Sequence, residues 1–183
     1  MKQTLIVFVQ DEPGVLNRIS SHIRRRNFNI ESLVAGRTER KDITRMTLVL
    51  NEPNKTKQRI VVESLKQLID VYDVIDTTEI ESHIREYALV KVLLKKEEMD
   101  QAYKVIEPVH GKLIDSNTDA MIFELTGYEE EVESVIKSLQ EFNILEIVRS
   151  GKVAMVAGNN LEHQPELNKS EPNWSTSRIL ESY

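Results

Sequence analysis

The sequence has 183 residues, a formal net charge of −6 and no cysteine, and 40% of its residues are hydrophobic and 30% charged. This composition is typical of a globular protein with a buried core, and the lack of cysteine excludes disulfides, thiolate catalysis and cysteine-ligated metal sites. The acidic balance argues against nucleic acid as a partner, because phosphate binding depends on clustered Lys and Arg.

The first predicted element is a buried strand over Thr4–Val9, which is short, apolar and rich in β-branched residues. Its apolar run, LIVFV, is too short for a signal peptide or a membrane span, so we expect a cytoplasmic protein without a membrane partner. A helix is expected next, because Leu16, Ile19 and Ile23 recur at helical spacing.

The rest of the first 78 residues predicts a hairpin, a helix and a last strand. Apolar and polar residues alternate over Asn29–Ala35 and Thr44–Leu50, and a charged turn separates the two runs. Apolar residues then return at helical spacing around Val61 to Ile69, and Val71–Ile75 is expected to form a short strand. The resulting order, βαββαβ, predicts a first domain over 1–78.

The same order of elements recurs without visible sequence identity from about residue 84, which predicts a second domain over 79–158. Its expected strands are Ala88–Leu94, Lys112–Asp115, Met121–Thr126 and Ile144–Val156, the last interrupted at Gly151. We therefore expect an α+β protein with two ferredoxin-like βαββαβ domains, each an antiparallel sheet with both helices on one face. Because LIVFV is apolar on both sides, the second face of its sheet needs a cover, either a dimer partner or the other domain.

The last segment, 159–183, is polar and contains two prolines. This composition is expected of a mobile tail with little regular structure. An ordered latch, docked through Trp174, Ile179 and Leu180, is the alternative that the sequence leaves open.

The turn after the first strand, DEPGVLNRIS, has two interpretations. In the first, Pro13 occupies the first helical position, where its missing N–H costs nothing, and Asp11 caps the helix. In the second, Gly14 lets the carboxylate of an amino acid approach the N–H groups at the start of the helix. Side-chain oxygens of Asp11 and Asn29, which we expect nearby, would bind the ammonium group, and apolar neighbours would contact an aliphatic side chain. The candidate effector-binding residues are Asp11, Gly14, Val15, Leu16, Asn29 and Ile30.

Four motifs carry a resemblance to a known family. DEPGVLNRIS, followed by NIESL and a TRMT segment, is similar to the regulatory (small) subunit of acetolactate synthase, also called acetohydroxyacid synthase. The stretch IVRSG, Ile147–Gly151, resembles the end of the second domain in that family. The resemblance covers about residues 1–158, and it implies an N-terminal ACT domain, a second ferredoxin-like domain and a homodimer formed through the ACT domains.

The resemblance also implies a function. The chain would not be an enzyme by itself and would carry no cofactor. It would activate a catalytic (large) subunit that holds thiamine diphosphate, magnesium and FAD, and would confer feedback inhibition by valine or a similar amino acid at the ACT dimer interface. An Asn commonly stands in the family where this chain has Asp11, whereas Gly14 and Asn29 match. The Asp11 carboxylate would attract the ammonium group but repel the carboxylate of the ligand, which weakens valine binding.

Other functions are less well supported by the sequence. The four histidines have no i, i+4 pair and suggest no metal site, and no phosphate-binding glycine motif occurs. A free-standing ACT-domain amino-acid sensor with another partner, or an enzyme on the same scaffold, stays open as an alternative. The cluster of His22 and Arg24 to Arg26 suits the end of the first helix, and docking of a partner is its alternative role.

Overall fold

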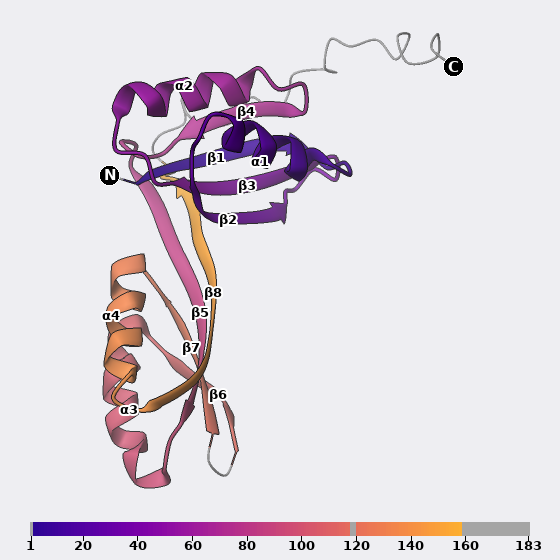
Figure 1. The fold of residues 1–183 in the computed structure, drawn as a ribbon. Coiled ribbons are helices and arrows are strands. Elements are labelled where there is room, and N and C mark those ends of the chain that lie inside the picture. Colours follow the sequence, from indigo (N-terminus) through magenta and orange to yellow (C-terminus); the bar gives the residue numbers. More distant parts are fainter. Residues whose placement is uncertain (1, 118–119, 159–183) are drawn as a thin grey trace.

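The computed structural model describes residues 2–117 and 120–158, and the expected tail lies outside this part of the chain. It contains two four-stranded antiparallel sheets, ordered β2-β3-β1-β4 and β6-β7-β5-β8. Each sheet has two α-helices on one side (Figure 1). The predicted α+β fold of two ferredoxin-like βαββαβ repeats is confirmed.

The first unit follows the expected order of elements. Its strand and helix bounds are β1 (Gln3–Gln10), α1 (Val15–Arg25), β2 (Ile30–Arg37), β3 (Ile43–Leu50), α2 (Lys55–Lys66) and β4 (Val71–Asp76). Alternate residues of β1, such as Leu5 and Val7, join the core beneath the helices, while Ile6 and Phe8 point to the other face of the sheet. All eight residues of β1 are buried, as expected of a central strand that is apolar on both sides.

The second unit repeats the order and adds two short 3-10 helices, Lys96–Glu98 and Glu107–Val109, on either side of α3. Its other elements are β5 (Ser82–Leu93), α3 (Met99–Ile106), β6 (Lys112–Ser116), β7 (Ala120–Gly127), α4 (Glu129–Leu139) and β8 (Asn143–Val156). A separate core, centred on Phe123 and Leu125, fills the space between this sheet and its helices. The domain limits of 1–78 and 79–158 stay a prediction.

The two units meet where β5 and β8 extend beyond their own sheet. These strands run as a two-stranded ribbon to the face of the first sheet that carries no helix (Figure 1). Ala154 of the ribbon packs there against Ile6, Phe8 and Ile75, and Ile84 is partly buried against the same group. Of the two covers expected for this face, a dimer partner or the other domain, the structure shows residues of the second unit on it, and the homodimer stays a prediction.

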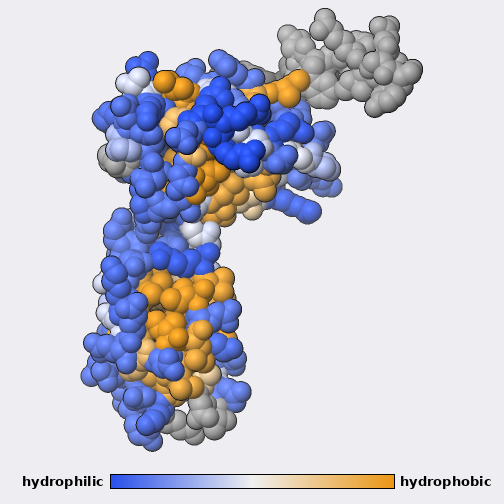
Figure 2. Space-filling model, viewed as in Figure 1, coloured by the Kyte–Doolittle hydropathy of each residue, from blue (hydrophilic) through white to orange (hydrophobic). Residues whose placement is uncertain are grey.

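The surface of the second unit is unevenly apolar. Figure 2 shows apolar side chains gathered on one side of this unit, beside a largely hydrophilic boundary with the first unit. Leu93, Leu145, Ile147 and Val148 of its sheet are each 40% or more exposed. Apolar side chains gathered on a surface, as in Figure 2, are typical of interaction surfaces.

Candidate functional site

The turn between β1 and α1 is organised around Gly14. This residue has a left-handed backbone, with φ at 88°, and it directly precedes the helix, which begins at Val15 without a side-chain cap. The prediction of Pro13 as the first helical residue and Asp11 as the cap is therefore wrong. The left-handed residue turns the chain after Pro13, and a glycine adopts this conformation without steric cost. A Cβ at Gly14 would also lie 3.1 Å from Nη1 of Arg18.

Asp11 is attached to the sheet and not to the helix. Its Oδ1 accepts a hydrogen bond of 3.0 Å from the hydroxyl of Thr44, and its backbone N–H donates to the carbonyl of Asp42 at 2.9 Å. The side chain is nevertheless exposed at the end of β1. A carboxylate is thus held beside the turn, where it can accept a hydrogen bond from a ligand.

The N–H groups at the start of the helix are those of Gly14, Val15 and Leu16, and two of them are available at this turn. The N–H of Val15 donates to the carbonyl of Glu12 at 3.4 Å, whereas no acceptor within the described residues contacts the N–H of Gly14 or Leu16. The Val15 side chain is buried in the core, and Leu16 is 46% exposed. Leu16 is therefore the apolar residue that a ligand at this turn could contact.

Arg18 is a further residue of the turn that the sequence analysis did not single out. Its guanidinium forms two hydrogen bonds to the buried carboxylate of Asp70, Nε to Oδ2 at 2.5 Å and Nη2 to Oδ1 at 2.9 Å. The hydrogen bond to Asp70 raises the pKa of Arg18, so the side chain remains charged. The guanidinium lies close to Gly14, but the paired Asp70 carboxylate compensates its charge, so its attraction for an anionic group there is modest. Its spacing of four residues from Gly14, one turn along the helix, is the signal that could have identified it.

Asn29 and Ile30 lie at the other end of the sheet. Ile30 pairs with Leu50, which pairs with Gln3 at the start of β1, while Asp11 follows the last residue of β1. At about 3.3 Å per residue, the length of β1 separates the two ends by about 23 Å. The expectation that Asn29 lies near the first turn of the helix is wrong within one chain. The reason is that β1 and β2 run in the same direction, and α1 carries the chain back between them.

The described residues, 2–117 and 120–158, contain no cluster of three or more acidic or histidine side chains that could hold a metal ion. Within the same ranges, none of the helices combines the length and apolar character of a membrane span.

Comparison with known proteins places both units in one family. Residues 5–73 match a sequence family described as "AHAS small subunit-like ACT domain", and residues 85–158 match one described as "Small subunit of acetolactate synthase". The chain is 39% identical over 159 residues to the probable acetolactate synthase small subunit of Archaeoglobus fulgidus, covering 87% of this chain and 99% of the relative. The chain belongs to the acetolactate synthase small-subunit family.

Other members of the acetolactate synthase small-subunit family agree with this assignment. The acetolactate synthase small subunit of Mycolicibacterium smegmatis is 37% identical over 155 residues, which are 85% of this chain and 91% of the relative. The crystal structure of the acetolactate synthase small subunit of Thermotoga maritima superimposes with a TM-score of 0.75 at 30% identity, covering 86% of this chain and 98% of that chain. The resemblance that the motifs carry is thereby confirmed.

The structure explains one of those motifs, IVRSG. The register of β5 and β8 shifts between Glu86 and Ala88, opposite this motif. The side-chain hydroxyl of Ser150 accepts a hydrogen bond of 3.1 Å from the N–H of Tyr87, in place of a backbone hydrogen bond between the strands. The backbone of Gly151 is left-handed, with φ at 79°. The motif is therefore the bulge at which the ribbon leaves the second sheet.

The basic cluster at the end of α1 is divided between surface and interior. Arg24, Arg25 and Arg26 are exposed, whereas His22 is buried, with Nδ1 3.3 Å from Nη1 of Arg26. Burial, together with the charges of Arg26 and Arg25, lowers the pKa of His22 below its usual 6.5. Docking of a partner at the exposed arginines stays a hypothesis.

Acid should destabilise the protein in part through His22. In the unfolded chain, His22 binds a proton at a higher pH than it does in the folded chain. The contribution of neutral His22 to the stability of the fold is therefore complete above pH 6.5 and is lost below it. Between about pH 7.5 and about pH 5.5, we expect the melting temperature to fall by less in His22→Gln than in the wild type. Melting curves test this, with the exposed His83→Gln as control. Equal losses in wild type and His22→Gln would contradict the assignment.

Proposed function

We propose that this chain is the regulatory subunit of acetolactate synthase in branched-chain amino-acid biosynthesis, acting in the cytoplasm. It activates the catalytic subunit and confers feedback inhibition by valine or a similar amino acid. Thiamine diphosphate, magnesium and FAD belong to the catalytic subunit in this proposal. Family membership over both units supports the assignment, and the chemistry of the Gly14 turn supports the type of effector.

The turn matches the groups of a zwitterionic amino acid. The free N–H groups of Gly14 and Leu16 and the charge of Arg18 favour the carboxylate of the effector. The Asp11 side chain can accept a hydrogen bond from the ammonium group, and exposed Leu16 can contact an aliphatic side chain. In one chain this is half of a site, because Asn29 lies at the other end of the sheet.

A dimer through β2 completes the site in this proposal. β2 is an edge strand, and within the described residues its outer edge pairs with no other strand. Antiparallel pairing of β2 with its copy reverses the partner's strand relative to the first chain. The start of the partner's β2, with the partner's Asn29, then lies at the same end of the joined sheet as Asp11 and Gly14. The observation that carries the proposal is that Asp11 and Gly14 lie at one end of the sheet and Asn29 at the other.

Reconstitution with a catalytic subunit tests the regulatory role. The catalytic subunit from the same source is mixed with this chain, and the two are expected to co-elute and to form acetolactate faster than the catalytic subunit alone. Bovine serum albumin at the same concentration serves as the control for non-specific stabilisation. Separate elution together with an unchanged rate would refute the role. Recovery of a different partner from the source cell would then favour the free-standing sensor.

Replacing Asp11 by asparagine is expected to strengthen valine binding about three- to tenfold, because it removes a negative charge close to the carboxylate of the ligand. The asparagine oxygen can still accept from Thr44, so the turn keeps its anchor. Calorimetric titration of both proteins with valine, leucine and isoleucine measures the change. Weaker binding by Asp11→Asn would contradict the expected repulsion between Asp11 and the carboxylate of the ligand, and binding of none of the three by either protein would overturn the effector assignment.

A further inference from the structure

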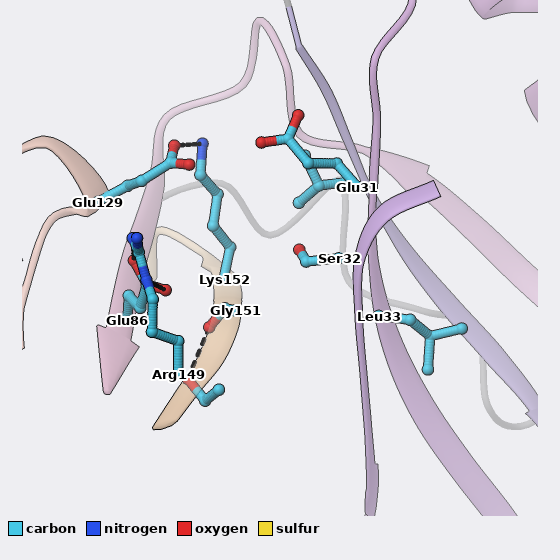
Figure 3. A pocket seen from close by; sticks show the side chains of 10 residues that line it. Glu31, Ser32, Leu33, Glu86, Glu129, Arg149, Gly151 and Lys152 are labelled. Carbon is cyan, nitrogen blue, oxygen red and sulfur yellow. Dashed lines mark hydrogen bonds and ion pairs between the residues drawn. The ribbon is translucent and has the colours of Figure 1, made fainter. Parts of the chain in front are cut away.

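A single lysine connects the two units on the side of β2. Lys2, which precedes β1, forms an ion pair with Glu31 of β2 and a second ion pair of 2.9 Å with Glu129 of α4. Lys152 of β8 holds the other oxygen of Glu129 at 2.6 Å. Glu31 lies across a gap from Glu129 and Lys152 (Figure 3). Lys2 spans the two sides through its two ion pairs.

These charges are partly removed from solvent. The side chain of Lys152 is 14% exposed and that of Glu129 is 23% exposed. Burial by itself would raise the pKa of Glu129, but hydrogen bonds from Lys152 and Lys2 lower it. Hydrogen bonds to Glu31 and Glu129 raise the pKa of Lys2. Lys2 itself is 40% exposed and Glu31 is 33% exposed, so each ion pair of Lys2 is weak by itself. The pairs act together, because Lys2 and Lys152 both bind Glu129.

β2 and β8 also touch directly beside this bridge. A Cβ added to Gly151 would lie 2.8 Å from Cβ of Ser32, so the glycine lets the two backbones approach closely. A cavity of about 430 Å³ opens next to this contact and is lined by residues of β2, β8 and α4 (Figure 3). In addition to the apolar packing of Ala154 and Ile84 against the first sheet, the β2 side of the junction therefore has a close contact, a charged bridge and free space. The free space leaves room for the second unit to shift on this side.

The bridge begins within two residues of the candidate effector site. Asn29 and Ile30 directly precede Glu31, at the start of the same strand. The register of β2 with β3 shifts between Ile30 and Ser32, so Glu31 lies at an irregularity of the strand directly after Ile30. A displacement of Asn29 and Ile30 is passed to Glu31 through the covalent backbone, and the irregularity leaves Glu31 freer to move than a residue within the regular ladder. Effector contact with Asn29 can thus reach the boundary with the second unit over one or two residues.

We propose that the Lys2 bridge between Glu31 and Glu129 couples effector binding at β2 to the position of the second unit. This coupling rests on the proposed function, because it assumes an effector at Asn29. The second unit has two arrangements, and the bridge stabilises the one seen here. The effector shifts the equilibrium because it binds the two arrangements with different affinities. Changes in affinity of about 5- to 150-fold are usual for such coupling.

The distance between the units tests the bridge without any effector. The chain has no cysteine, so Lys41→Cys and Glu141→Cys, both at exposed positions in different units, accept spin labels selectively. Labelled protein is diluted with unlabelled protein to suppress distances between chains. We expect a narrow distance distribution for the wild type and a broader or shifted one for Lys2→Met and Glu129→Gln. Lys137→Met, which breaks the exposed pair with Glu133 inside the second unit, is the matched control and should leave the distribution unchanged.

The coupling itself is measured as the ratio of the valine dissociation constants without and with the catalytic subunit. In the wild type this ratio should differ from one by about fivefold or more, and in Lys2→Met it should fall close to one. Loss of the bridge should also change valine binding to the isolated Lys2→Met chain, because it changes the populations of the two arrangements that valine distinguishes. Identical distance distributions and identical ratios in wild type and Lys2→Met would overturn the inference. If valine does not bind the wild type, the proposed effector assignment is refuted. The distance measurement then tests by itself whether the bridge holds the second unit in position.

Discussion

An equimolar mixture of Gly14→Ala and Asn29→Ala chains is expected to regain about a quarter of the effector sites, although each variant alone binds valine poorly. Random exchange of subunits makes about half of the dimers mixed, and each mixed dimer holds one site with an intact turn and an intact partner's Asn29. Loss of a hydrogen bond to the charged ammonium group in Asn29→Ala should weaken binding by about 10- to 150-fold. Calorimetric stoichiometry before and after mixing measures the recovery.

The reverse mixture is the control. A chain that carries both Gly14→Ala and Asn29→Ala is mixed with wild type, and mixed dimers then contain no intact site if each site is built from two chains. About a quarter of the sites should survive in that case, whereas about half should survive if each chain builds its own site. Survival of half, together with no recovery in the first mixture, would contradict a site shared between chains.

Replacing Arg149 by methionine is expected to lower the free energy of unfolding by about 2–3 kcal/mol, because it leaves the carboxylate of Glu86 buried without its partner. Arg149 donates from Nε and Nη2 to the two oxygens of Glu86 at 2.8 and 2.7 Å, and Glu86 is 4% exposed. The effect stays below that of a fully buried pair, because the Arg149 side chain is one-third exposed. Urea unfolding at fixed protein concentration measures the loss.

Two further variants separate the buried charge from simple loss of contacts. The double variant Arg149→Met/Glu86→Met removes both charges and should recover most of the lost stability. Lys137→Met breaks the exposed pair with Glu133, at 3.7 Å, and should cost no more than about 0.5 kcal/mol. If the double variant is less stable than Arg149→Met, the pair does not act through the buried charge of Glu86.

Much of the fold could be predicted because the apolar periodicity is regular. The run Leu5 to Val9 and the helical spacing that follows it were sufficient to place a central strand and a helix. The helix was expected to bury Leu16 with Ile19 and Ile23, yet Val15 takes that place in the core. The difference arises from where the helix starts. Because Gly14 is the last residue before the helix, Val15 and Ile19 lie one turn apart on the buried face.

The candidate site was only partly predictable. The turn at Gly14 could be recognised from its residues, but the position of Asn29 depends on strand direction. An 11-residue helix, about 16 Å long, separates the end of β1 from the start of β2. Contacts between distant residues, such as Arg18 with Asp70 or Lys2 with Glu129, leave no pattern in a single sequence.

The rate of acetolactate formation during a valine titration, measured on the catalytic subunit with and without this chain, tests the central claim most directly. We expect valine to lower the rate only when the chain is present, and the Asn29→Ala chain to activate the catalytic subunit while abolishing the response to valine. A response to valine that is the same with the chain, without it and with the Asn29→Ala chain would contradict the proposed regulatory function.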